Sequence, residues 1–546
     1  MKVFLLHRDR DFSPAPGLRD EVFDALVSGN LWALPNVRRN LERQRNLGSR
    51  PPRSENHDVL AQDLELDTLW GAMASGDEFL FETAKRVVLS SLRDPAEIVY
   101  RQGVLADCAE HESTVVELYR IAIEALAYQR EVGSLWAGAG PDLILSRSVR
   151  LLKLHVQAMR RLRQVADEHA DRFSSDGFTR FFATVREELA DDYLEAVDGH
   201  LRDLEFGRGL LESAQLGTGD RGESYIVHEP PRELRWKERL PLIGNRKEPE
   251  YSFELHPRDQ AGATALAAIR GKGINQVADA VARSADHVQS FFTMLRLELA
   301  FYLSCLNLRA RLDRKGETTC YPEPVAEHQL SLTAEGIYDI CLTLHLDERA
   351  VGNDVEADGK SLVMITGANQ GGKSTLVRAL GLAQLMMQSG MFVGADSFRA
   401  NVCSGVHTHY KREEDLTMEG GKLDEELGRM SQLVDRLTPH AMVLCNESFA
   451  STNEREGSEI ARQIVRAMLA RRIKVLYVTH MYDLAHSLHA ERLDSALFLR
   501  AQRESDGRRT FKLLEGEPLP TSYGEDSYRR IFGDADAPHA ALESMP

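Results

Sequence analysis

The stretch Gly367-Ala-Asn-Gln-Gly-Gly-Lys-Ser-Thr375 decides the fold of the second half of this chain. Its spacing, G-x-x-x-x-G-K-S, is typical of loops that wrap around phosphate groups. The apolar run Leu362–Thr366 before it predicts a strand, and the run 376–385 after it predicts a helix. A strand, a glycine-rich loop and a helix N-terminus would aim backbone N–H groups and the positive end of the helix dipole at a polyphosphate.

The residue types inside this loop predict a site for ATP and Mg²⁺. Glycines let the backbone approach phosphates closely, Lys373 can reach the β- and γ-phosphates, and Ser374 can ligate Mg²⁺. A glycine-rich turn without a ligand is the alternative, but it gives no reason for Lys and Ser after the last glycine. The predicted cofactor-binding residues are Gly367, Ala368, Asn369, Gln370, Gly371, Gly372, Lys373, Ser374 and Thr375.

Composition narrows the class of protein. A length of 546 residues predicts at least two domains. The 67 basic and 84 acidic residues give a net charge of −17, which argues against indiscriminate polyanion binding but allows a local basic groove. Six scattered cysteines without a C-x-x-C pair favour a reducing compartment over a disulfide frame or a zinc site.

Targeting signals are also absent from the sequence pattern. The apolar run at residues 1–6 is too short for a signal peptide, and charged residues follow it. We find no stretch approaching the roughly 20 apolar residues that cross a bilayer. The sequence therefore predicts a soluble, cytoplasmic protein without a membrane partner.

Apolar spacing divides the chain into three regions: an N-terminal extension at 1–56, a mainly helical region at 57–325, and an α/β region at 326–546. Within the helical region, Val149, Leu152, Val156 and Met159 predict one amphipathic helix. A second stripe predicts one long helix, and an insert at about 206–260 changes to Gly, Pro and short strand-like runs. The stripe consists of Val277, Val281, Ala285, Val288, Phe292, Leu295, Leu299, Tyr302 and Leu306.

The α/β region predicts a mainly parallel sheet with ligands at the carboxyl ends of its strands. The candidate strands are Leu362–Thr366, 441–445, 474–479 and 495–499. The second of these runs into Asn446 and Glu447, a pattern in which the first residue holds Mg²⁺ and the second positions the attacking water. The third ends at His480, which can contact a γ-phosphate.

Together these motifs resemble, in order, the MutS DNA mismatch-repair ATPases of the ABC-type P-loop superfamily. The match is strongest over about 330–530 and extends more weakly over 57–325. The resemblance implies an α/β ABC-type ATPase domain at the C-terminus, preceded by a helical core and lever. The segments that carry it, besides the phosphate loop, are 351–355, 390–393, 446–457, Thr479-His480, Gly516, 522–524 and, upstream, 64–110.

Three departures from the family pattern bear on function. Only about 60 residues precede the helical core, which leaves no room in this sequence for mismatch-recognition and connector domains. Asn446 replaces the usual Asp, so Mg²⁺ would gain less charge stabilisation. The segment 418–422, Met-Glu-Gly-Gly-Lys, replaces the usual Ser-Thr signature, and Gly420 and Gly421 could donate N–H groups to a phosphate.

The resemblance implies an ATPase that works as a homodimer, binds DNA by its backbone or shape, and takes part in repair or recombination, with possible repair-protein partners. Glu447 and His480 would be catalytic, Ser374 and Asn446 would hold Mg²⁺, and Gly420 and Gly421 would bind the nucleotide of the other subunit. One alternative is a nucleotide-gated scaffold or clamp with negligible hydrolysis. Another is a partner-binding ATPase that does not touch DNA.

The predicted DNA contacts form a basic cluster within the insert, around Trp236. A solvated charged loop explains the cluster equally well. The pair His407 and His409 suggests a metal site, but no third ligand is evident, so we interpret it as structural. The cluster consists of Arg232, Arg235, Lys237, Arg239, Arg246 and Lys247.

Overall fold

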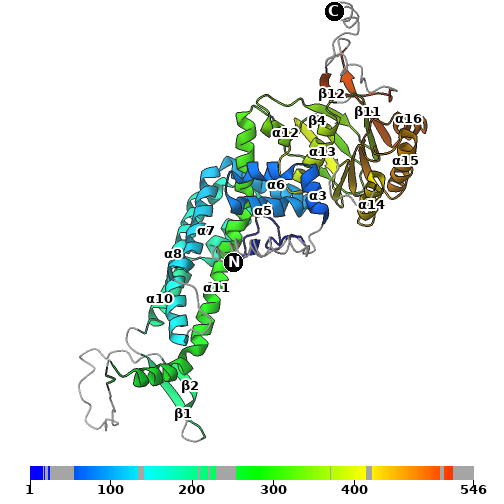
Figure 1. The fold of residues 1–546 in the computed structure, drawn as a ribbon. Helices are drawn as coiled ribbons and strands as arrows, with labels where there is room; N and C mark the ends of the chain where they lie inside the picture. The colour runs from blue at the N-terminus through cyan, green and yellow to red at the C-terminus, as the bar shows by residue number, and fades with distance from the viewer. Residues whose placement is uncertain are drawn as a thin grey trace, which may run out of the picture. The chain divides into compact units, whose positions relative to one another are not determined.

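The computed structural model describes residues 1–15, 18, 23–24, 55–132, 140–206, 210–218, 222–228, 254–256, 258–368, 370–412, 421–504 and 509–519. The chain divides into two compact units (Figure 1). The first comprises Met1–Val3, Val116–Arg172 and Thr179–Arg296, and the second comprises Phe4–Val115, Phe173–Phe178 and Leu297–Pro546. Residues 4–115 thus belong to the same unit as the α/β region.

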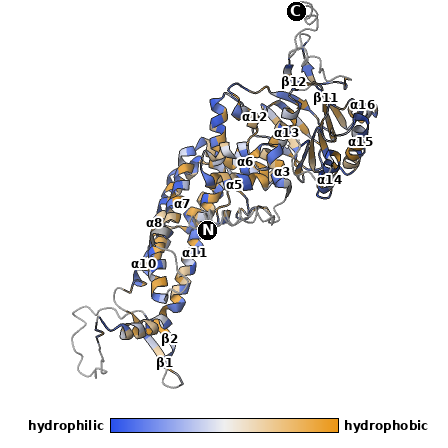
Figure 2. Ribbon diagram, viewed as in Figure 1, coloured by the Kyte–Doolittle hydropathy of each residue, from blue (hydrophilic) through white to orange (hydrophobic). Residues whose placement is uncertain are grey.

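The first unit is built from helices and one hairpin. Val149, Leu152, Val156 and Met159 are buried along α8, as the apolar spacing predicts, and hydrophobic and hydrophilic colours alternate along this helix (Figure 2). Strands β1 and β2 pair antiparallel within the predicted insert. The elements are α7 (Glu112–Val132, from Val116 on), α8 (Pro141–His169), η1 (Ala170–Arg172), α9 (Asp176–Glu188, from Thr179 on), α10 (Asp191–Asp203), β1 (Leu211–Leu216), β2 (Gly222–His228) and the first part of α11 (Gln260–Arg314).

Helix α11 confirms the predicted long helix and corrects one expectation. It runs for 55 residues, and Phe292, Leu295, Leu299 and Tyr302 of the predicted stripe are fully buried. By length and composition alone it could cross a membrane, which the sequence analysis did not anticipate. However, 72% of its most apolar window is buried inside the protein, as in the core helix of a folded domain.

The second unit contains a six-stranded sheet in the order β12-β11-β6-β10-β9-β8 among the described residues. All neighbours from β11 to β8 are parallel, as predicted, and β12 is antiparallel at the edge. The prediction missed β8 and a smaller sheet, β3-β7-β4-β5. The strands are β3 (Glu323–Val325), β4 (Leu332–Ile337), β5 (Asn353–Glu356), β6 (Leu362–Thr366), β7 (Ser397–Asn401), β8 (Val406–Tyr410), β9 (Met442–Asn446), β10 (Lys474–Val478), β11 (Ala496–Arg503) and β12 (Arg509–Glu515).

Helices cover both faces of the larger sheet, and every residue of β6 and β10 is buried. Val443 and Cys445 of β9 pack in one core with helices α14, α15 and α16. Leu444 points to the other face, where a side chain on Gly381 of α13 would lie 2.4 Å from it. The helices are α3 (Glu55–Asp63), α4 (Leu66–Ala74), α5 (Glu78–Leu89), α6 (Pro95–Glu110), α12 (Ile340–His345), α13 (Lys373–Gln388), α14 (Lys422–Val434), α15 (Glu454–Ala470) and α16 (Tyr482–Ala490).

The segment 390–393, one of those that carry the family resemblance, does not form a named strand. Gly390 ends the turn after α13 with φ 79°, and a side chain there would lie 2.3 Å from Arg101. Val393 makes only an isolated bridge with Cys320. The next strand is β7, which begins at Ser397. The backbone of Val393 exchanges both hydrogen bonds with Cys320, but the pairing does not extend to its neighbours as a strand.

The first residues of the second unit form an N-terminal strap, residues 4–12, that is tied down by buried polar groups. The Glu298 carboxylate accepts hydrogen bonds from the backbone N–H groups of Leu5 (2.7 Å), Leu6 (3.0 Å) and Phe12 (3.2 Å). Burial raises the pKa of Glu298 to about 7, although these three N–H groups oppose the rise.

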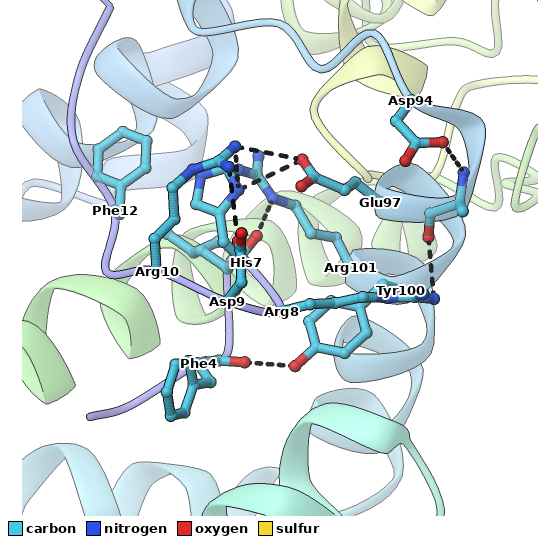
Figure 3. Close-up of polar contacts among 12 residues, drawn as sticks. Phe4, His7, Arg8, Asp9, Arg10, Phe12, Asp94, Glu97, Tyr100 and Arg101 are labelled. Atoms are coloured by element: carbon cyan, nitrogen blue, oxygen red, sulfur yellow. Dashed lines mark hydrogen bonds and ion pairs between the residues drawn. The ribbon is translucent and has the colours of Figure 1, made fainter. Parts of the chain in front are cut away.

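Helix α6 holds the same strap from its other side. Figure 3 shows the Tyr100 hydroxyl donating to the Phe4 carbonyl and Arg101 reaching toward His7. The Arg101 guanidinium also donates to the carbonyl oxygens of Leu6, at 2.7 Å, and of Ser389 at the end of α13, at 3.3 Å. Arg101 therefore joins the strap to the C-terminal end of α13.

We predict that Glu298→Ala lowers the free energy of unfolding by about 3 kcal/mol or more, because three buried N–H groups lose their acceptor. Urea denaturation measures this loss. Glu298→Gln, which keeps an acceptor oxygen, should cost less. The exposed Glu348 of the same unit supplies the control, since Glu348→Ala should change stability by no more than about 0.5 kcal/mol. Equal losses for Glu298→Ala and Glu348→Ala would show that the strap is not anchored by Glu298.

Candidate functional site

The loop between β6 and α13 depends on glycine because it packs against the backbone of the sheet edge. Gly367 and Gly372 have φ values of 111° and 87°, in the left-handed region. A Cβ atom on Gly371 would lie 2.7 Å from the Ala501 side chain, and one on Gly372 would lie 3.2 Å from the Phe511 carbonyl. Strands β11 and β12 thus fix the shape of the loop from outside.

Lys373 is the first residue of α13 and its amine lies inside the loop. The amine donates to the carbonyl oxygens of Gly367, at 2.7 Å, and Ala368, at 3.0 Å. Burial lowers the pKa of Lys373, the Glu447 carboxylate opposes that change, and Arg509 adds to it. A cation enclosed by carbonyl oxygens can exchange them for the more strongly charged oxygens of a phosphate group.

Arg509 of β12 is a cation that the sequence analysis missed. Its guanidinium donates to the Gln370 side-chain oxygen at 2.7 Å, so it sits at the rim of the loop. No motif marks this position, because β12 follows the phosphate loop by more than a hundred residues and reaches it only through the antiparallel pairing with β11. Asn369, also predicted to bind the cofactor, lies outside the described residues.

The two predicted Mg²⁺ ligands are adjacent. The Ser374 hydroxyl donates to the Asn446 side-chain oxygen at 2.9 Å, which joins the start of α13 to the end of β9. Ser374 is exposed and Asn446 is half-buried. A hydroxyl and an amide oxygen at this separation are both donor types that Mg²⁺ accepts, so the residues present fit a magnesium ion.

Glu447 and His480 also lie together, at the ends of the neighbouring parallel strands β9 and β10. Glu447 Oε1 is 3.6 Å from His480 Nδ1, an ion-pair distance. Contact with His480 lowers the pKa of Glu447, and the charges of Lys373 and Lys411 lower it further against the effect of burial. Glu447 is therefore a carboxylate at neutral pH and can accept a proton or orient a water molecule.

Other predicted site residues are placed apart from this group or fall outside the described part of the chain. Gly421 precedes α14 with extended backbone, φ −67° and ψ 151°. Thr375 is half-buried on the first turn of α13. Gly420, the basic cluster around Trp236 and residues 522–524 lie outside the described residues. The contact of Gly420 and Gly421 with a second subunit, and the DNA contacts, remain predictions.

Two models of known protein families match this chain, one in each half. Residues 93–315 match the family model of the MutS2 N-terminal domain, and residues 363–529 match that of MutS domain V. The second match contains the phosphate loop, Asn446, Glu447 and His480. The first covers α6 to α11 with the hairpin between them.

Curated relatives point to the same family. The DNA mismatch repair protein MutS of Streptococcus mutans is 28% identical over 292 residues, 50% of this chain and 34% of that protein. The Endonuclease MutS2 of Thermus thermophilus is 32% identical over 149 residues, 27% of this chain and 20% of that protein. The DNA mismatch repair protein MutS of Thermus aquaticus is 30% identical over 174 residues, 32% of this chain and 21% of that protein.

The chain spans between 20% and 34% of the length of these relatives. The helical part and the α/β part both carry family matches. The chain belongs to the MutS family.

Proposed function

We propose that this protein is a Mg²⁺-dependent ATPase that hydrolyses ATP at a homodimer interface and couples hydrolysis to DNA binding or clamp motion in repair or recombination. One observation carries the proposal. Lys373, Ser374, Asn446, Glu447 and His480 converge at the carboxyl ends of β6, β9 and β10, which are neighbours in one parallel sheet. Ligands of open α/β sheets bind at this edge.

The enclosed amine and the backbone of the loop account for phosphate binding. The triphosphate of ATP would take the place of the Gly367 and Ala368 carbonyl oxygens as partner of Lys373. Mg²⁺, held by Ser374 and Asn446, would neutralise charge on the phosphate oxygens. Gln370 and Arg509 lie at the loop rim, where Arg509 adds positive charge.

Hydrolysis would rest on positioning more than on covalent chemistry. Glu447, ionised at neutral pH, accepts a hydrogen bond from the attacking water and orients it toward the γ-phosphate. His480, adjacent to Glu447, donates to the γ-phosphate oxygens. Gly420 and Gly421 of the second subunit would close the site with backbone N–H groups, and closure would move the insert at about 206–260 through α8 and α11.

Asn446 favours a second candidate function, a nucleotide-gated scaffold or clamp with negligible hydrolysis. An amide gives Mg²⁺ less charge stabilisation than the carboxylate of the family pattern. Against this, Glu447 and His480 are both present and lie 3.6 Å apart. A steady-state turnover assay with Mg²⁺ separates the two candidates, because only the ATPase releases phosphate.

We predict that Lys373→Ala weakens MgATP binding about 100-fold or more, since a charge-assisted contact to the phosphates is lost. Isothermal calorimetry measures the affinity. Lys272→Ala, at an exposed position of α11 in the other unit, is the matched control and should bind as the wild type does. If Lys373→Ala binds MgATP as tightly as the wild type, the loop 367–375 is not the phosphate-binding site.

We predict that Glu447→Gln keeps the affinity for MgATP and lowers turnover about 100-fold or more, because the water loses its general base. The variant should also accumulate as a closed dimer with ATP, which sedimentation velocity detects. Asn446→Asp should strengthen the Mg²⁺ dependence and raise turnover. Equal phosphate release by wild type and Glu447→Gln would exclude Glu447 as the water-positioning residue.

We predict that the protein binds DNA through the phosphate backbone of the DNA and that its affinity falls steeply with salt. A plot of log affinity against log salt concentration should have a slope near about −5 if some six phosphates are neutralised. The probes are duplex, branched and single-stranded DNA at low salt. Replacing the six Arg and Lys residues around Trp236 with Gln should weaken binding and flatten the slope. If the variant keeps the wild-type affinity and salt slope on all three DNAs while it still binds MgATP, the insert is not the DNA site. If the wild type binds none of the three DNAs, the result favours the partner-binding ATPase.

A further inference from the structure

The turn that follows β9 is held in an unfavourable backbone conformation. Glu447 has φ 54° and Phe449 has φ 62°, both in the left-handed region and neither a glycine. This region is unfavourable for a residue with a side chain, because Cβ comes too close to the following carbonyl oxygen. A conformation of this kind persists only where surrounding contacts impose it, so the contacts on this turn control the direction of the Glu447 side chain.

Two of these contacts act on the backbone. Ser448, between the two strained residues, is fully buried, and its carbonyl oxygen accepts a hydrogen bond from the buried Tyr477 hydroxyl at 2.8 Å. The Phe449 carbonyl oxygen approaches α15 so closely that a Cβ atom on Gly457 would lie 2.4 Å from it. These contacts fix the far side of the turn to β10 and α15.

His409 of β8 makes the third contact, on the side chain of Ser448. The Ser448 hydroxyl lies 2.7 Å from His409 Nδ1 and 2.7 Å from the His409 carbonyl oxygen. The imidazole ring also stacks on Phe449, with 5.5 Å between centroids and 22° between planes. His409 therefore touches two of the three residues of the turn.

The opposite edge of the same ring contacts helix α14. His409 Nε2 lies 3.2 Å from the Glu426 backbone carbonyl oxygen, which can only accept a hydrogen bond. Burial, helped by Arg429, lowers the pKa of His409 to about 4, so the ring is neutral at pH 7. Nε2 then carries the proton and donates to Glu426, and the single proton of the Ser448 hydroxyl is shared between Nδ1 and the His409 carbonyl oxygen.

Helix α14 begins at Lys422, directly after Gly420 and Gly421, the residues that the proposed function assigns to the nucleotide of the partner subunit. One imidazole ring thus bridges two functional parts of a single chain. Its Nε2 edge holds the helix that carries the glycines, and its Nδ1 edge holds the turn that carries Glu447.

We propose that His409 is a positioning residue that makes the orientation of Glu447 depend on the position of helix α14. The inference rests on the proposed function and deepens it, because it supplies a regulation of the same site. When the glycines of one subunit engage the nucleotide of its partner, α14 shifts, and His409 passes that shift to the acid in the first subunit's own site. The two ATP sites of a dimer are coupled in this way.

Two conservative substitutions separate the two hydrogen bonds of the ring. The amide of Asn lies near the place of Nδ1, so His409→Asn keeps the bond to Ser448 and loses the bond to Glu426. The amide of Gln reaches the place of Nε2, so His409→Gln keeps the bond to Glu426 and loses the bond to Ser448. Ser448→Ala removes the turn bond from its other end. His407→Gln, at the neighbouring inward position of β8, is the matched control because His407 lies outside this contact.

The measurements are MgATP affinity, single-turnover hydrolysis, and amide hydrogen exchange of residues 447–452 with and without a non-hydrolysable ATP analogue. We expect His409→Gln and Ser448→Ala to hydrolyse ATP about 10- to 100-fold more slowly at unchanged affinity, with faster exchange in the turn. His409→Asn should keep slow exchange, which no longer responds to the analogue. His407→Gln should match the wild type in all three measurements.

The outcomes distinguish this inference from the proposed function. If the wild type hydrolyses ATP and both His409 variants match it in turnover and exchange, the positioning role is wrong and the ATPase stands. If the wild type binds but does not hydrolyse ATP, the ATPase fails. The exchange measurement needs no hydrolysis, so it still supports the relay when His409→Asn loses the response to the analogue and His407→Gln keeps it, and overturns it when the response persists in His409→Asn.

Discussion

The burial of helix α13 on all sides is the constraint on which the site depends. Nearly every residue from Leu376 to Gln388 is buried, because the helix lies between the larger sheet and the helices from the first part of the chain. Its C-terminal end is tied by Gln388, which donates to the carbonyl oxygens of Leu92 and Cys403 at 2.9 Å, and by Arg101 at Ser389. A helix fixed along its length and at its end cannot rotate, so Lys373 and Ser374 at its start have fixed positions.

Ion pairs also fix the register of α13. Arg378, in the middle of α13, pairs with Asp339 and Glu65, which belong to segments far apart in the sequence. Burial raises the pKa of Asp339, and Arg378 opposes the rise. Removing water from such a pair offsets much of its attraction, so the pair contributes little net stability. It does exclude other registers of α13, because any shift would leave a buried carboxylate without its partner.

The sequence analysis identified the parts of the fold that carry strong local patterns. Strands β6, β9 and β10 are near-continuous apolar runs because both faces of a parallel sheet are covered. The helix stripe through Phe292 and Tyr302 has the regular spacing of one buried face. The site residues followed from motif order along these strands. Short strands such as β3 and β5 carry no such pattern, and their pairing depends on residues distant in sequence.

Contacts made by tertiary packing could not be predicted either, because they join residues that are distant in sequence. No sequence pattern near Arg509 indicates that it reaches Gln370. The strap, residues 4–12, shows no regular spacing of apolar residues. Two residues carried a signal of a structural role in the sequence itself. Glu298 lies beside Leu295 and Leu299 on a buried helical face, where a carboxylate needs a partner. His409 sits in a short run ending β8, where a buried imidazole needs a donor and an acceptor.

Asn446 changes the charge balance at the strand ends. A carboxylate there would lie beside Glu447 and would favour protonation of one of the two acids. With an amide, Glu447 is the only acid among the predicted site residues, and contact with His480 and the charges of Lys373 and Lys411 all act to lower its pKa. The amide also binds a bare cation weakly, so most of the attraction for Mg²⁺ would come from the phosphates of ATP. Metal and nucleotide would then enter the site together, and an ionised Glu447 would already be in place when they do.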